Sequence, residues 1–84
     1  MSEQSPTAIA VLTHIVRSLV DDPSAVDVRV FEGSSRIRLE VAVGPGDLGR
    51  VIGRRGRTAQ NIRALVRAAA EKDGVDVDVD FLYD

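Results

Sequence analysis

Residues 51–58 of this 84-residue chain read Val51-Ile52-Gly53-Arg54-Arg55-Gly56-Arg57-Thr58. Two glycines stand three residues apart, between a short apolar segment and a longer one with helical periodicity. Because glycine has no Cβ, the backbone at Gly53 and Gly56 can pass close to another backbone or to a phosphate. A helix that begins just after Gly56 would direct its free N–H groups and the positive end of its dipole at the same loop. These residues are therefore predicted to bind phosphate.

Positive charge is concentrated around this loop. Six of the eleven basic residues and none of the 13 acidic residues lie between Leu48 and Ala70, although the chain as a whole has a formal charge of −2. All six are arginines, which make planar bidentate contacts with phosphate and stack on bases. They are Arg50, Arg54, Arg55, Arg57, Arg63 and Arg67. This distribution favours an anionic ligand over the alternative of a solvated helix face.

A second pair of glycines with the same spacing occurs in Gly46-Asp47-Leu48-Gly49. Its aspartate would repel a phosphate, so we interpret this copy as a turn and the start of a short helix that Asp47 caps. The segment from Gly44 to Arg50 partly resembles a nucleotide-binding P-loop, but the lysine and the following serine or threonine are absent. The candidate site is therefore the later pair of glycines.

Three stretches have the apolar spacing of helices. The first begins with the capping residue Ser5 and ends before Pro23. The second runs from Asp47 to about Ile52, and the third runs from about Arg57 to Lys72, where Asp73-Gly74 stops it. The apolar residues expected on the inner faces of the two long helices are Ala8, Val11, Leu12, Ile15, Val16, Leu19, Ile62, Leu65, Val66 and Ala69.

Three other stretches, 26–31, 36–43 and 75–81, alternate apolar and polar residues as half-buried strands do. A turn at 32–35 joins the first two as a hairpin. The resulting order, α-β-β-α-α-β, predicts an α+β fold in which a three-stranded mixed sheet has its helices packed on one face. A right-handed crossover makes 36–43 and 75–81 parallel, with 36–43 in the centre. Asp76, Asp78 and Asp80 would then face outward near Arg36 and Arg38, as structural groups and not as a calcium site.

Composition predicts one domain, residues 6–84, after a flexible N-terminus of residues 1–5. The chain has no cysteine and one histidine, His14, so we expect no disulfide, no metal site, no cofactor and no catalytic residue. No apolar run approaches the roughly 20 residues that span a bilayer, and the N-terminus lacks the pattern of a signal peptide. We therefore expect a cytoplasmic protein that is not an enzyme.

The predicted order of elements, with Ile52-Gly53-Arg54-Arg55-Gly56 between the two middle helices, resembles a type II KH domain. It is most similar to the small stand-alone bacterial KH proteins of the KhpA type. The run Gly46-Asp47-Leu48-Gly49-Arg50-Val51-Ile52-Gly53-Arg54-Arg55-Gly56-Arg57-Thr58 carries this resemblance. The resemblance implies an RNA chaperone or post-transcriptional regulator that binds about four nucleotides of single-stranded RNA across the loop. It also implies a homodimer, or a heterodimer with a larger Jag-like KH protein.

The flanking helices and the last strand would wall a groove for the bases. Only three aromatic residues, Phe31, Phe81 and Tyr83, are available to stack on bases. An aliphatic floor could instead be formed by Val51, Ile52 and Ile62. The residues expected to bind RNA are Arg50, Ile52, Gly53, Arg54, Arg55, Gly56, Arg57 and Asn61.

Two other functions fit the same sequence. Two helices joined by a glycine turn also describe a helix-turn-helix that binds duplex DNA. In that case Arg57, Gln60, Asn61 and Arg63 are residue types that read bases. Alternatively, the chain is a KH-fold module whose main task is to bind another protein.

Overall fold

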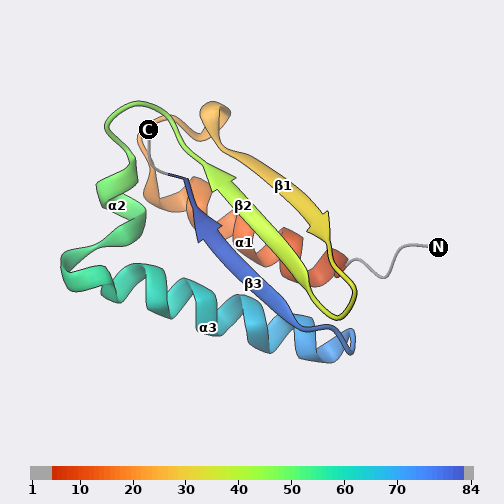
Figure 1. The fold of residues 1–84 in the computed structure, drawn as a ribbon. Coiled ribbons are helices and arrows are strands. Elements are labelled where there is room, and N and C mark those ends of the chain that lie inside the picture. The colour runs from red at the N-terminus through yellow and green to blue at the C-terminus, as the bar shows by residue number, and fades with distance from the viewer. Residues whose placement is uncertain (1–4, 83–84) are drawn as a thin grey trace.

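The computed structural model describes residues 5–82 (Figure 1). In chain order they form α1 (Pro6–Leu19), β1 (Asp27–Glu32), β2 (Ile37–Ala42), α2 (Leu48–Ile52), α3 (Arg57–Lys72) and β3 (Val77–Phe81). Two three-residue 3-10 turns, Pro23–Ala25 and Arg54–Gly56, were not predicted; they follow α1 and α2. The predicted order of elements and the α+β fold class are confirmed.

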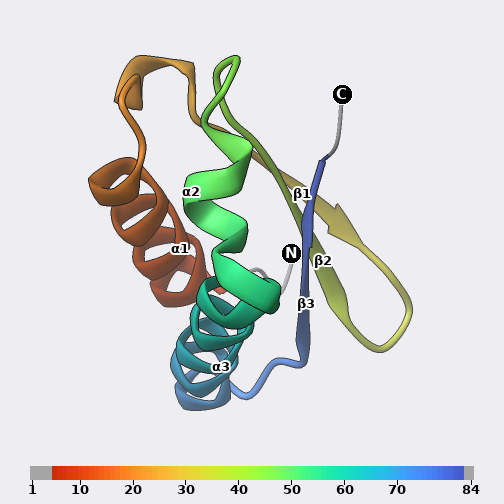
Figure 2. The same cartoon turned by 90° about the vertical axis from the view of Figure 1, so that its left-hand side faces the viewer.

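The sheet has the order β1-β2-β3, with β2 in the centre as predicted. β1 and β2 are antiparallel, with Val30 opposite Leu39, whereas β2 and β3 are parallel, with Leu39 opposite Val79. A parallel pair requires a crossover on one face of the sheet, and α2 and α3 supply it. Figure 2 shows all three helices on the same side of the sheet, which leaves the other face open.

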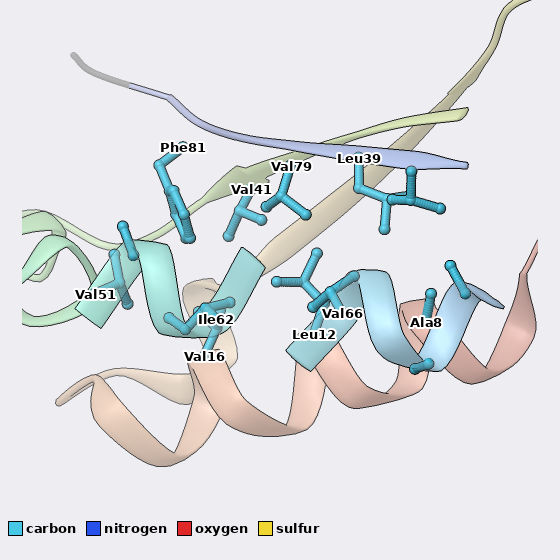
Figure 3. Close-up of a cluster of buried hydrophobic side chains, with 14 of the residues drawn as sticks. Ala8, Leu12, Val16, Leu39, Val41, Val51, Ile62, Val66, Val79 and Phe81 are labelled. Carbon is cyan, nitrogen blue, oxygen red and sulfur yellow. The ribbon is translucent and has the colours of Figure 1, made fainter. Parts of the chain in front are cut away.

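The core lies between the sheet and the two long helices (Figure 3). Leu12 of α1 and Val66 of α3 pack with Leu39 of β2, and each is almost completely buried. Burial of such a side chain contributes about 1.5–3 kcal/mol to folding. The core is therefore the main source of stability for a chain without disulfides.

Two of the predicted core residues are exposed. Leu65 is 55% exposed and Leu19 is 37% exposed. Leu65 precedes the buried Val66 by one residue, and a step of one residue turns a helical side chain by about 100°. Leu19 is the last residue of α1 and lies between the exposed Ser18 and the buried Val20. The apolar stripes of both helices are consequently narrower than their sequences predict.

Ser5 belongs to the folded domain, although we predicted it to be part of a loose N-terminus. The backbone N–H of Ala8 donates to the Ser5 hydroxyl (3.3 Å), as in a helix cap, and that hydroxyl donates to Asp73 Oδ2 (2.6 Å). Ser5 is 1% exposed, because it lies between the start of α1 and the end of α3. The rest of the predicted loose segment, residues 1–4, falls outside the described residues.

The predicted stop of α3 at Asp73-Gly74 is confirmed. Gly74 has a φ of 71° and its N–H donates to the Glu71 carbonyl, while the Val75 N–H donates to the Ala70 carbonyl. This pair of hydrogen bonds is the Schellman motif, which closes a helix C-terminus. Val75 is thereby part of the helix end, so β3 begins two residues later than we predicted.

Candidate nucleic-acid interface

The loop between α2 and α3 has a backbone that requires glycine. Gly53 has φ 73° and ψ 178°, a combination that almost no other residue adopts. Arg55 (φ 56°, ψ 24°) and Gly56 (φ 73°, ψ 13°) are both in the left-handed region, and α3 begins directly after them. The predicted break between the two helices at these glycines is therefore confirmed.

Gly53 lies against the first turn of α3. A Cβ atom at Gly53 would lie 2.7 Å from Thr58 Cβ and closer still to Thr58 Oγ1. The N-cap of α3 is Gly56, and no side chain makes a cap hydrogen bond there. Thr58 instead occupies the space that Gly53 leaves, and so brings the loop close to the helix. A Cβ at Gly56 would meet nothing within 4 Å. Glycine is therefore favoured at position 56 by its backbone conformation alone.

Three exposed arginines, Arg54, Arg55 and Arg57, surround this loop. Within residues 5–82, none of the ion pairs involves any of them. The first turn of the 16-residue α3 contains no acidic residue either. The charges of the arginines therefore add to the positive end of the helix dipole. The exposed Arg55 has a left-handed backbone conformation, which costs an L-residue about 1–2 kcal/mol of conformational free energy.

Arg50 differs from these three because it is ion-paired. Its Nη2 lies 2.9 Å from Asp21 Oδ2 and its Nε lies 3.4 Å from Asp47 Oδ1. Asp47 is 3% exposed and accepts hydrogen bonds from the backbone N–H groups of Asp21 (3.2 Å) and Asp22 (3.1 Å). It stands at the N-cap of α2 as predicted, but its side chain makes no cap hydrogen bond. Asp47 instead fastens α2, and the loop that follows it, to the chain beyond α1.

Asp47→Ala should destabilise the protein by about 1–3 kcal/mol, because two backbone N–H groups would lose their acceptor. Urea denaturation measures the change in unfolding free energy. Asp21→Ala is the matched control, since it removes an exposed ion pair with the same Arg50 and should change stability by less than about 1 kcal/mol. Equal losses in the two variants would show that Asp47 does not fasten α2.

The predicted aliphatic floor is mostly core. Val51 is 0% exposed and Ile62 is 2% exposed, so neither can contact a ligand. Ile52, at the end of α2, is half-buried and remains beside the loop. Its neighbour Val51 belongs to the hydrophobic core.

The polar residues of α3 lie on two different sides of the helix, one of which faces β3. Arg63 and Arg67 point toward β3: Arg63 Nε donates to the Val79 carbonyl (3.1 Å), and Arg67 Nη2 lies 3.8 Å from Asp78 Oδ1. Asn61, a predicted RNA-binding residue, is exposed and lies two residues before Arg63, which places it about opposite on a helix of 3.6 residues per turn. The structure thus brings Arg63, not Asn61, to the side that β3 walls. Sequence analysis placed Arg63 in the arginine cluster and among the residues for reading DNA, but not among those expected to bind RNA, because helix phase relative to the sheet depends on tertiary packing.

The aspartates of β3 lie on the open face of the sheet beside arginines, as predicted. Arg36 Nη1 lies 2.8 Å from Asp78 Oδ2, and Arg38 Nε lies 4.0 Å from Asp80 Oδ2. The hydrogen bond to Asp78 raises the pKa of the Arg36 guanidinium. Among residues 5–82, no group of three or more histidine, aspartate or glutamate side chains is arranged to hold a metal ion.

Replacing Asp76, Asp78 and Asp80 together by asparagine should leave the fold intact, since exposed ion pairs contribute about 0–1 kcal/mol each. RNA binding should stay unchanged or become slightly tighter, because repulsion of phosphate falls. Thermal denaturation and RNA titration measure the two effects. A calcium-dependent rise in Tm that the triple variant loses would instead show that these aspartates are ligands.

No helix in the described part of the chain is both long and apolar enough to cross a membrane. The fold resembles Era in two solved structures, one of Aquifex aeolicus Era bound to GDP·AlF4−, the other of Era with MgGDPNP and nucleotides 1506–1542 of 16S ribosomal RNA. In both cases the TM-score is 0.67 and the sequence identity is 20%. Each match covers 88% of this chain but only 29% and 28% of the Era chains, and it shows the fold alone.

Sequence similarity identifies the family of this chain more specifically than the likeness in fold does. The family described as "KhpA/KhpB, KH domain" matches residues 10–81. Proteins described as RNA-binding protein KhpA are 56% identical over 70 residues in Leifsonia xyli and 47% identical over 68 residues in Caldanaerobacter subterraneus. Both matches cover 81% of this chain, and they cover 90% and 91% of the respective relatives. The chain therefore belongs to the KhpA/KhpB family of KH domains.

Proposed function

We propose that this protein binds single-stranded RNA in the cytoplasm, without catalysing a reaction, as an RNA chaperone or post-transcriptional regulator. The observation that carries the proposal is the loop Gly53–Gly56, where exposed arginines without ion-pair partners among residues 5–82 meet the positive end of α3. Membership in a family with relatives described as RNA-binding proteins supports it.

The loop can hold phosphates in two ways. Backbone N–H groups of the first helical turn have no carbonyl partner within the helix. That of Arg57 donates to the Arg54 carbonyl of the preceding turn, and the cap provides no side chain to satisfy those that follow. The guanidinium groups of Arg54 and Arg55 can add bidentate hydrogen bonds to phosphate oxygens. Contacts of this kind position a strand and carry no sequence information.

The proposal is tested by titrating the protein with single-stranded RNA and with duplex DNA of equal length. RNA should bind more tightly, and duplex DNA should compete poorly. α2 has only five residues and strands flank the helix pair, which is unlike a helix-turn-helix. Tighter binding of duplex DNA would favour the DNA-binding alternative. Absence of binding to both would favour a protein-interaction module.

We also propose that the chain pairs with a second copy or with a larger Jag-like KH protein. The exposed Leu65 supports this, since Ala64 and Ala68 are exposed beside it on α3 and form a small apolar surface. Sedimentation equilibrium of the isolated chain should show a dimer that Leu65→Lys abolishes. If wild type and variant are monomers at every concentration, self-pairing through α3 is excluded, and binding to the larger protein is the remaining test.

A further inference from the structure

Arg63 is held by β3 on two sides of its guanidinium group. Its Nε donates to the carbonyl of Val79 at 3.1 Å, and its guanidinium carbon lies 5.3 Å from the centre of the Phe81 ring. Val79 and Phe81 are themselves buried, so both contacts are made to parts of the sheet that are fixed by the core. One edge and one face of the guanidinium are thus occupied by the protein.

The two terminal nitrogens of the Arg63 guanidinium, Nη1 and Nη2, remain available to a ligand. A guanidinium carries five N–H groups in one plane, and the Val79 carbonyl takes the one on Nε. Arg63 is half-buried, and within residues 5–82 it forms no ion pair. The N–H groups of Nη1 and Nη2 therefore form a fork whose orientation is already set. A fork fixed in this way loses little conformational freedom when it binds.

Arg63 is also correctly placed relative to the phosphate-binding loop. It follows Gly56 by seven residues, which is about two turns or roughly 10 Å along α3. Its hydrogen bond to Val79 places it on the side of α3 that faces β3, and these two elements are neighbours in the fold (Figures 1 and 2). A strand whose phosphates rest on Gly53–Gly56 and whose bases turn toward β3 would reach Arg63 within the four nucleotides that such a loop holds.

We propose that Arg63 selects the base of one of these nucleotides, and that it selects a base with two adjacent hydrogen-bond acceptors. Guanine presents such a pair at O6 and N7, and cytosine presents one at O2 and N3. On adenine and uracil each of the corresponding acceptors has an N–H donor beside it, which would face the donors of the fork. The inference rests on the proposed RNA binding and adds base specificity to a loop that reads only phosphates.

The test uses four RNA octamers: octauridine, and octauridine with a single guanosine, cytidine or adenosine at the fourth position. The guanosine octamer, the cytidine octamer or both should bind wild-type protein about tenfold more tightly than the other two. A fifth octamer with 7-deazaguanosine separates the two bases. It lacks the N7 acceptor, so it should lose the advantage of guanosine if guanine is the base that Arg63 selects.

Arg63→Lys keeps the positive charge and removes the planar fork. It should bind octauridine within about twofold of wild type, since phosphate attraction is retained, but it should bind all four octamers equally. Arg67→Lys is the matched control: it changes the same residue type one turn later on the same side of α3, and should keep the base preference. The preference is a ratio of two affinities, so a reduced fraction of folded protein does not affect it.

Two results would overturn the inference alone: wild type that binds all four octamers equally, or Arg63→Lys that retains the wild-type preference. In both cases RNA is still bound, and the proposed function stands. If wild type binds none of the octamers, the proposed function and the inference both fail.

Discussion

Gly53→Ala should lower the unfolding free energy by more than about 3 kcal/mol, a large fraction of the stability of a small domain. Its φ of 73° and ψ of 178° cost an alanine about 1–3 kcal/mol. The added methyl group would also overlap Thr58, which lies 2.7 Å away at Cβ and 3.1 Å away at the backbone nitrogen. That nitrogen belongs to the first turn of α3, so relief of the overlap would require the helix to shift.

Gly56→Ala is the matched control for this prediction. Its φ is also 73°, but a Cβ atom there meets open space, so only the conformational cost of about 1–2 kcal/mol remains. Urea denaturation of the two variants gives both changes in unfolding free energy. In addition, Thr58→Gly should restore part of the stability that Gly53→Ala removes. If the two alanine variants are equally stable, the contact between loop and helix is not what requires glycine at position 53.

Replacing Arg54 and Arg55 together by aspartate should weaken RNA binding by more than about 100-fold. Each lost hydrogen bond between charged groups is worth about 1.5–3 kcal/mol, and each aspartate also repels phosphate. Both side chains are exposed, so the unfolding free energy should change by less than about 1 kcal/mol. Fluorescence anisotropy with a labelled octamer, together with a denaturation curve, separates the two effects.

A double variant in which Arg17 and Arg29 become aspartate controls for net charge. It changes the charge of the chain by the same amount, but on the outer face of α1 and on the open face of the sheet. Both of these arginines are exposed. This control should weaken RNA binding far less than the loop variant, because the attraction between distant charges is screened by salt. Equal loss in the two double variants would mean that net charge, and not the loop, determines binding.

The sequence predicts elements best where local chemistry marks both ends. α3 extends from Arg57 to Lys72 as predicted, because a glycine loop precedes it and Asp73-Gly74 closes it. The central position of β2 was also predicted correctly. Features that depend on distant segments were missed: Ser5 bonds with Asp73, 68 residues away, and Asp47 with Asp21, 26 residues away. No local pattern marks such partners.

The same distinction between local features and features that depend on distant segments applies to the candidate site. Glycine conformation and clustered arginines are local properties, so the sequence predicted the loop. Which arginines have partners is a tertiary property: Arg50 is paired with Asp21 and Asp47, and Arg63 is bound to β3. Helical periodicity places Asn61 and Arg63 on different sides of α3, but only the packed structure shows which side faces β3.

The most direct test of RNA binding by the Gly53–Gly56 loop is the salt dependence of RNA affinity, for wild type and for the variant with aspartate at positions 54 and 55. For a single strand, the slope of log affinity against log salt is about −0.7 per phosphate contacted. Wild type should show a steep negative slope, and the folded variant should show a slope shallower by about 1.4 or more, for two lost phosphate contacts. A variant that folds normally and binds RNA with the affinity and slope of wild type would contradict this account.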